Sequence, residues 1–230
     1  MLSVVGCATQ PISNEVASHL KRVGVISMAA REFEREYVGF MVFGNENETK
    51  DITAWGIDKA YEDQIAAALE RITESRAIRV PYSVTDFSHV NDLNGPIDHP
   101  LFWDPNWDSI RTVAKAYCDA NSLDAIIFAT RERSGDFIGG TNQRVDGAGI
   151  YARQKIAKLH LVSRLTVFDC SSAKPLLLRR VSPLKDIPHD LAVKPIPQWT
   201  AQDEDLVRQG LIDLPGGAWE NSLRTIFPQR

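Results

Sequence analysis

The sequence predicts a three-layer α/β sandwich with a mixed, mostly parallel sheet, a C-terminal antiparallel hairpin and terminal helices. Short apolar runs that fit buried strands alternate with segments whose apolar residues recur at helical spacing. Strands that alternate with helices imply parallel pairing through helical crossovers. A polar turn near residues 170–175 separates two strand-like runs, and this hairpin would add antiparallel strands at one edge.

The first elements are two strands and a helix. Residues 23–28 form an apolar run typical of a buried strand, and residues 37–43 are apolar on both faces. The charged run at 31–36 is interpreted as a solvated turn or strand extension, and 44–48 as an exposed turn. A helix is expected over 58–73 because apolar residues recur there at spacings of three and four: Ile57, Tyr61, Ile65, Leu69 and Ile72.

The middle of the chain predicts a strand, a long loop, a helix and a second strand. A strand at 76–81 precedes an irregular stretch over 82–103, and loops of this length are often functional or disordered. Asp104 and Pro105 then provide an N-cap and a first helical residue. Residues 124–130 form the most apolar strand, and a glycine-rich loop follows at 134–149.

The last part predicts the hairpin and two helices. A long strand ends near Asp169 and pairs with residues 176–181, followed by an extended proline-rich segment at 183–197. Helices are expected over 201–209 and 218–227. An exposed edge within residues 159–181 also allows a structural homo-oligomer, because unpaired edge strands invite pairing with another chain.

Composition favours one globular domain, which we expect to span residues 20–230. Apolar residues make up 43% of the 230 residues and charged residues 24%, and 26 basic against 30 acidic residues give a net charge of −4. No basic block occurs, so nucleic acid is not an expected partner. No run approaches the roughly 20 apolar residues that span a bilayer.

Residues 1–19 are interpreted as a signal remnant followed by a polar tether. The stretch Val4-Val5-Gly6-Cys7 resembles the bacterial lipobox, in which aliphatic and small residues precede a cysteine that becomes lipidated. This resemblance implies a fatty-acyl anchor at Cys7 on the periplasmic side of a bacterial membrane. The preceding part of the signal would lie upstream of Met1 or have been trimmed. Alternatively, residues 1–6 are a short strand and Cys7 is a buried thiol.

The layout over residues 20–185 resembles that of small envelope lipoproteins whose domain is similar to the amino-terminal domain of the TolB protein. The resemblance lies in a lipobox, a tether, a β-α-β-α-β unit and a closing hairpin. It implies a non-catalytic binding or assembly role in the cell envelope, with an unknown envelope protein as partner.

A soluble enzyme that binds a nucleotide is the competing hypothesis. Gly147, Gly149 and Ala152 fit the pattern G-x-G-x-x-A, and Asp169 stands twenty residues after Gly149. The preceding segment, however, is not an apolar strand, and the following one looks more like a strand than a helix. We therefore favour a loop that leads into a strand with close backbone packing.

Other chemical motifs give no catalytic residue, metal site or cofactor. No Walker-type loop, Gly-x-Ser-x-Gly elbow or His-Glu-x-x-His pair occurs in the sequence. His89 and His99 lie on the long loop near Asp86, Asp92 and Asp98, a set that could ligate a metal only if the loop made these residues converge. His19, His160 and His189 are expected to be surface or strand residues.

Trp103 and Trp107 flank the start of the second helix. Such a pair either covers the end of the sheet or anchors a partner protein or glycan, since Trp is over-represented at binding hot spots. Cys118 and Cys170 could form a disulfide in an oxidising compartment. We expect two unpaired thiols instead, because nothing in the sequence fixes the distance between them.

Overall fold

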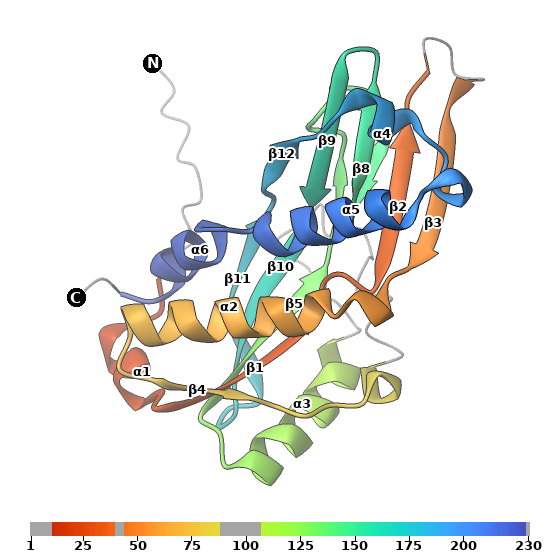
Figure 1. Ribbon diagram of the computed structural model, residues 1–230. Helices are drawn as coiled ribbons and strands as arrows, with labels where there is room; N and C mark the ends of the chain where they lie inside the picture. Colours follow the sequence, from red (N-terminus) through yellow and green to blue (C-terminus); the bar gives the residue numbers. More distant parts are fainter. Residues whose placement is uncertain (1–10, 40–43, 88–106, 229–230) are drawn as a thin grey trace, which may run out of the picture.

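The computed structural model describes residues 11–39, 44–87 and 107–228. Within these residues the chain forms a mixed α/β fold with two five-stranded sheets and several helices, as Figure 1 shows. This confirms the predicted mixed α/β sandwich, but the sheets are not mostly parallel, because antiparallel strand pairs outnumber parallel ones among the described residues. The second sheet was not expected, because much of it comes from segments that the sequence suggests are turns.

The first sheet has the strand order β11-β10-β5-β1-β4. Strand β1 pairs in parallel with β4 and β5, whereas β10 pairs antiparallel with β5 and β11. The helical crossovers and the C-terminal hairpin are therefore as predicted. The bounds of these strands are Arg22–Met28 for β1, Arg76–Arg79 for β4, Ala125–Arg131 for β5, Ser163–Asp169 for β10 and Lys174–Val181 for β11.

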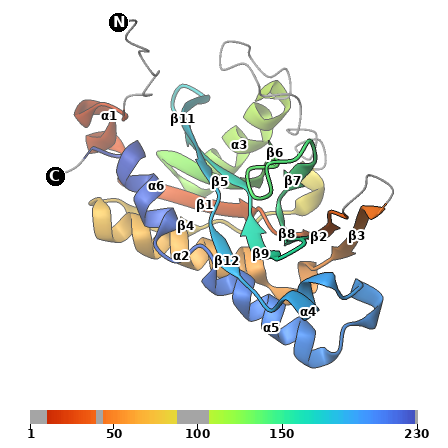
Figure 2. The same ribbon diagram turned by 90° about the horizontal axis from the view of Figure 1, so that it is seen from above.

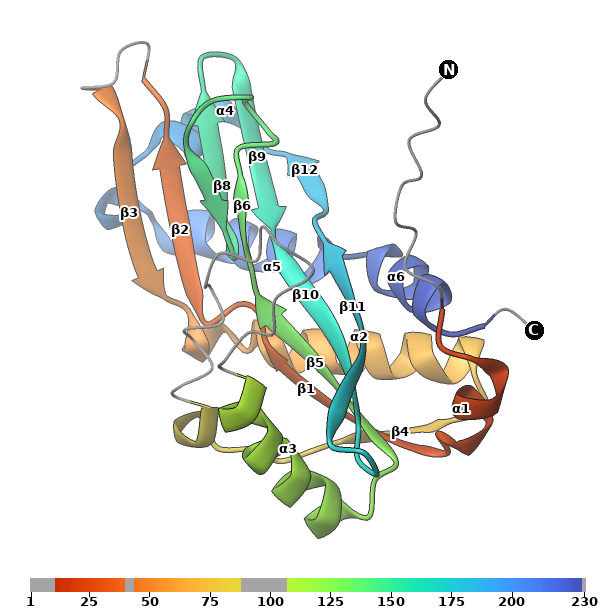
Figure 3. The same cartoon turned by 180° about the vertical axis from the view of Figure 1, so that it is seen from behind.

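Helices cover both faces of the first sheet and complete the three layers (Figures 2 and 3). Helices α2 (Ile57–Ile72) and α6 (Ala218–Ile226) lie on one face, and α3 (Trp107–Asn121) lies on the other. The predicted apolar face of α2 is buried as far as Leu69. Tyr61 packs edge-on against Trp219 with 5.5 Å between ring centroids, which joins α2 to α6.

The second sheet has the strand order β12-β9-β8-β2-β3. Strands β2 and β8 are parallel, and the other neighbours are antiparallel. Helices α4 (His189–Val193) and α5 (Ala201–Asp213) lie against one face, and the short hairpin β6–β7 lies on the other side. The strands are β2 (Glu32–Tyr37), β3 (Glu46–Asp51), β6 (Arg133–Gly135), β7 (Arg144–Asp146), β8 (Ala148–Arg153), β9 (Ile156–Leu161) and β12 (Leu184–Asp186).

The charged run at residues 31–36 is mostly strand β2, an inner strand of the second sheet rather than a solvated turn. Phe33 and Arg35 alternate toward the core and are fully buried. The Arg35 guanidinium donates to the carbonyls of Ala192 and Val193 at 3.2 and 2.5 Å and lies 3.1 Å from a Glu46 carboxylate oxygen. These partners compensate its burial.

Other turn assignments also need correction. The exposed segment near residue 46 is strand β3. The glycine-rich loop overlaps the end of β6, contains β7 and includes the first residues of β8. The long strand that ends at Asp169 is two strands, β9 and β10. The proline-rich segment contains β12, α4 and a short 3-10 helix, Ile196–Gln198, while two more such helices span Thr53–Trp55 and Val84–Phe87. A short or exposed strand lacks the alternation of apolar and polar residues by which strands are recognised in a sequence.

The domain's packing begins at Ile12, within the segment expected to be a tether. Ile12 is buried and its N–H donates to the carbonyl of Ile226 at 2.9 Å. Ser13 then accepts a hydrogen bond from Val16 N–H at 3.2 Å and caps α1 (Asn14–His19). Among the described helices, none is long and apolar enough to cross a membrane.

Candidate functional site: the Asp136 loop

A single carboxylate organises the loop that joins β6 to β7, residues 136–143, which we call the Asp136 loop. Asp136 accepts hydrogen bonds from the N–H groups of Ile138, Gly139 and Thr141 at 2.9, 2.6 and 2.9 Å. It also accepts from the Tyr151 hydroxyl at 2.8 Å. Burial opposes ionisation, but the hydrogen bonds, led by that from Thr141, hold the pKa of Asp136 below its usual value.

The Asp136 loop is fastened to the sheet and still presents an aromatic ring to solvent. A Cβ atom at Gly139 would lie 2.0 Å from the Tyr151 hydroxyl, so only glycine allows this approach. Arg153 of β8 donates to the Gly139 carbonyl at 2.7 Å. Phe137, held between Asp136 and these contacts, is 43% exposed. A fixed loop with an exposed ring suits binding, because little conformational entropy is lost when a partner covers it.

Glu36 is a buried acid in the same region. It lies opposite Tyr151 in the β2–β8 register and is only 6% exposed. Within the described part of the chain, no side chain or backbone group forms a hydrogen bond or ion pair with the Glu36 carboxylate. Burial, together with the charges of Glu34 and Asp136, raises the pKa of Glu36 to about 7. An acid with such a pKa in a polar region marks a candidate functional site.

A network of ion pairs joins β2 and the β6–β7 hairpin to the end of β5 in the first sheet. Arg131, the last residue of β5, lies 2.8 Å from Asp146 and 2.6 Å from Glu32, and Arg133 lies 3.0 Å from Asp146. Glu132, the residue after β5, lies 2.8 Å from Arg164 of β10. The network links the two sheets through compensated charges, which is a structural role.

The pattern G-x-G-x-x-A begins at Gly147 and continues into β8, and it is not a strand–turn–helix unit, so the nucleotide-binding hypothesis lacks its structural context. Only Gly147 has a left-handed backbone, with φ of 52°. A Cβ atom at Gly149 would lie 2.2 Å from the Glu34 carbonyl oxygen and 2.8 Å from His160 Nε2. This glycine therefore allows close strand packing, as we favoured. Asp169 accepts from Ser172 N–H at 2.9 Å and organises the β10–β11 turn.

His160 is a strand residue, in agreement with the sequence. It is completely buried in β9, and burial lowers its pKa to about 4. Its Nδ1 atom has no hydrogen-bond partner among the described residues. No group of three or more His, Cys, Asp or Glu side chains in the described ranges is placed to hold a metal ion.

The predicted lipidation site and partner-binding residues are not described by the structure. Cys7, Trp103, His89 and His99 lie outside the described residues. Helix α3 begins at Trp107, whose side chain also falls outside the described part. Sequence reasoning missed Glu36, Asp136 and Phe137. An Asp followed by Gly139-Gly140-Thr141 is a turn signal that could have indicated the Asp136 loop.

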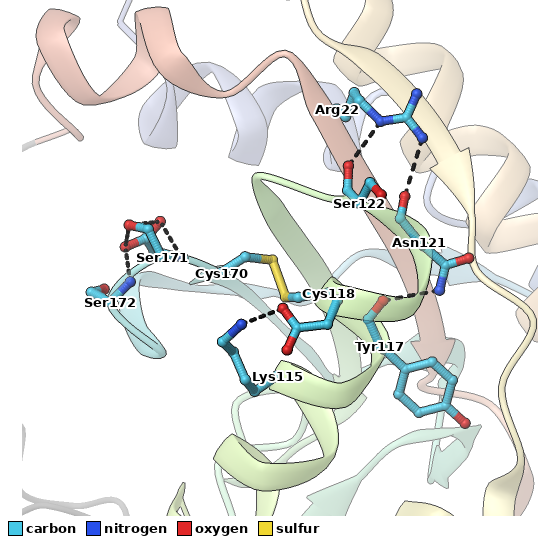
Figure 4. Close-up of a disulfide and its surroundings, with 11 residues drawn as sticks. Arg22, Lys115, Tyr117, Cys118, Asn121, Ser122, Cys170, Ser171 and Ser172 are labelled. Carbon is cyan, nitrogen blue, oxygen red and sulfur yellow. Dashed lines mark hydrogen bonds and ion pairs between the residues drawn. A yellow bond between two sulfur atoms is a disulfide. The ribbon is translucent and has the colours of Figure 1, made fainter.

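Cys118 and Cys170 form a disulfide, which corrects the expectation of two unpaired thiols (Figure 4). The bond joins α3 to the residue after β10, with 5.7 Å between Cα atoms and a sequence separation of 52. Cys118 is 1% exposed and Cys170 is 6% exposed. The Leu123 N–H donates to the Cys118 carbonyl, and the Cys170 N–H donates to the Asp124 carbonyl. These two hydrogen bonds hold both cysteines close to residues 123 and 124.

No protein-family model and no curated protein matches the chain. Among the solved structures similar to it are lipoprotein GNA1162 from Neisseria meningitidis (9% identity, 84% of this chain and 96% of that chain, TM-score 0.34) and the PelC dodecamer from Paraburkholderia phytofirmans (5%, 86% and 87%, 0.34). Hypothetical protein CT253 from Chlamydia trachomatis is also similar (11%, 88% and 97%, 0.37). A bacterial lipoprotein is thus among these structures, but TM-scores this low support no functional inference.

Proposed function

We propose that the protein is a lipid-anchored bacterial envelope protein that binds a partner and catalyses no reaction. The observation that carries the proposal is the buried Cys118–Cys170 disulfide. Structural disulfides persist in oxidising compartments, such as the periplasm, and are rare in the cytosol. The bond therefore supports export, independently of the N-terminal sequence.

The lipobox-like stretch supplies the anchor in this proposal. Val4-Val5-Gly6-Cys7 would be processed so that Cys7 carries the acyl chains, on the periplasmic side of the membrane. One acyl chain gives only marginal attachment, whereas two or more give stable attachment to the membrane surface.

The binding role is supported by the Asp136 loop, which presents Phe137 on a fixed backbone. Trp103 and Trp107 remain proposed partner-binding residues from the sequence. Asp58 is another acid whose pKa burial raises, and its carboxylate has a structural role. It accepts from Ser27 Oγ at 2.7 Å and from Ala29 and Ala30 N–H at 2.8 and 3.1 Å, and so joins α2 to the end of β1.

Metabolic labelling with a fatty-acid analogue tests the anchor, using the gene together with its upstream DNA. We expect label in the wild-type protein and none in Cys7→Ala. The double variant Cys118→Ala/Cys170→Ala is the matched control, because it removes the other cysteines and should keep the label. An unlabelled wild-type protein that stays in the cytosol would overturn the proposal.

A further inference from the structure

The point at which the chain enters the domain is fixed by the structure. Ile12 is buried beside the end of α6, and its N–H donates to the Ile226 carbonyl at 2.9 Å. Helix α1 follows directly and is capped by Ser13. Any anchor that precedes Ile12 therefore holds the domain at the end where α1 and α6 lie, on the left in Figure 1.

The connection between that point and the proposed lipidation site is short. Only residues 8–11 separate Cys7 from Ile12. Five residue steps of about 3.6 Å reach at most about 18 Å, whatever conformation they adopt. A tether extending through residue 19, as the sequence suggested, would reach more than twice as far. The entry point of the domain thus stays within about 18 Å of the lipidated residue.

This reach is small compared with the size of the domain. A compact chain of this length has a radius of gyration of about 17 Å and hence a diameter of about 45 Å. The Asp136 loop and the β8–β9 turn lie at the side of the molecule opposite α1, as Figures 2 and 3 show. The short connection therefore keeps the α1 end of the domain near the membrane, and the Asp136 loop side is the part held farthest from the lipidated residue.

The surface near the entry point has a mixed charge and an open hollow. Lys21 lies 3.5 Å from Glu74, and both side chains are well exposed. Adjacent opposite charges attract anionic lipids only weakly, so the tether and not a basic patch would hold this face at the membrane. A cavity of about 210 Å³ opens here, lined in part by Ala17, Leu20, Ile72 and Phe227.

We propose that the face formed by α1, the C-terminal end of α2 and residues 226–228 lies on the lipid headgroups. The Asp136 loop then points into the periplasm, toward a protein partner. This orientation rests on the proposed lipidation of Cys7. It deepens that proposal by assigning one face of the domain to the lipid surface and the opposite face to recognition.

Site-specific photocross-linking in cells tests the orientation with the full-length lipidated protein. A benzophenone amino acid replaces Ser18 in α1, or Lys155 in the β8–β9 turn, both of which are exposed. Phospholipid adducts are measured by mass spectrometry, and the fatty-acid label on Cys7 is measured in the same samples. Glu15, also exposed in α1, provides a second probe site if the Ser18 variant fails to fold.

We expect at least about fivefold more phospholipid adduct from Ser18 than from Lys155, because the short connection restricts the reach of the domain. Inserting about 20 Gly/Ser residues between Gln10 and Pro11 should reduce this ratio toward one, since such a linker spans about 28 Å on average. Equal adducts in a labelled protein without the insertion would overturn the orientation alone. Absence of label on Cys7 would overturn the anchor and, with it, the orientation.

Discussion

Tyr151 in β8 donates its hydroxyl hydrogen to Asp136 at 2.8 Å, and this bond ties the Asp136 loop to the second sheet. The same carboxylate holds three backbone N–H groups of the loop. One acid therefore decides both the shape of the loop and its position. Burial and the Asp136 charge in turn raise the pKa of Tyr151, so the phenol stays protonated and remains a donor.

Replacing Asp136 by Asn should destabilise the protein by about 2–3 kcal/mol, because bonds to a charged acceptor are lost or weakened. Tyr151→Phe removes one hydrogen bond and should cost about 1 kcal/mol. Urea unfolding at pH 7 measures both, and a double variant reports their coupling. Additive losses in the double variant would contradict the coupling.

Because the folded pKa of Asp136 is lowered, the stability that its carboxylate contributes is present above the unfolded pKa and is lost as the pH falls through the folded pKa.

Glu36→Gln should stabilise the protein at pH 8 and leave it nearly unchanged at pH 4. The pKa of Glu36 is about 7 in the folded protein, above the usual value of 4.5. A raised carboxyl pKa gives stability that is fully present below the unfolded pKa and is lost as the pH rises through the folded pKa. The neutral amide avoids this loss, which we expect to be about 1–3 kcal/mol.

Urea unfolding from pH 4 to 8 measures this effect, and the gain should develop between pH 4.5 and about 7. The exposed residue Glu15 supplies the matched control, Glu15→Gln, which should follow the wild-type curve. A gain in Glu36→Gln that does not change with pH would exclude ionisation of Glu36 as its cause.

Removing the disulfide in Cys118→Ala/Cys170→Ala should lower the free energy of unfolding by up to about 4 kcal/mol. The bond closes a loop of 52 residues, and the chain-entropy model gives about this value for that length. Urea unfolding measures this loss of stability.

A second experiment measures whether the disulfide forms in cells. Protein is taken from cells in alkylating buffer and analysed by mass spectrometry, and two alkylated thiols in exported wild-type protein would contradict the presence of the disulfide.

Phe137→Ala should leave the free energy of unfolding within about 0.5 kcal/mol of wild type, because Phe137 is an exposed surface residue, with 43% of it accessible to solvent. If the Asp136 loop is the recognition surface, the same change should weaken binding to an envelope partner by about 2 kcal/mol, or roughly thirtyfold. Leu206→Ala is the control, since that side chain is 47% exposed and belongs to α5, on the other side of the second sheet from the β6–β7 hairpin (Figure 3). Affinity for the purified partner distinguishes the two variants.

The parts of the fold that the sequence predicts well are those with an apolar period. Helix α2 and strand β5 differ from their expected bounds by about one residue, since Tyr61, Ile65 and Leu69 recur at helical spacing and β5 is a continuous apolar run. The hairpin β10–β11 was also predicted, because a polar turn separates its two strands.

The second sheet was not predicted because its inner strand β2 contains a buried charged residue, Arg35. The Arg35 guanidinium donates to the carbonyls of residues 192 and 193, and a sequence does not show such distant partners.

The candidate site was not predicted for a related reason. Glu36 and Asp136 are brought together by the pairing of β2 with β8, which depends on the whole fold, and each residue alone looks like an ordinary surface acid.

Gly149→Ala separates the structural role of the glycines in β8 from a nucleotide-binding role. A Cβ atom there would lie 2.2 Å from the Glu34 carbonyl oxygen, which is backbone and cannot move aside easily. We expect a loss of at least about 2 kcal/mol in the free energy of unfolding, from the forced separation of β2 and β8. Gly135→Ala is the matched control, since nothing lies within 4 Å of the added atom, and it should differ from wild type by less than about 0.5 kcal/mol. Unfolding in urea compares the stabilities of the two variants. A Gly149→Ala protein that keeps wild-type stability but loses binding to a nucleotide would instead support a phosphate-binding role for this segment.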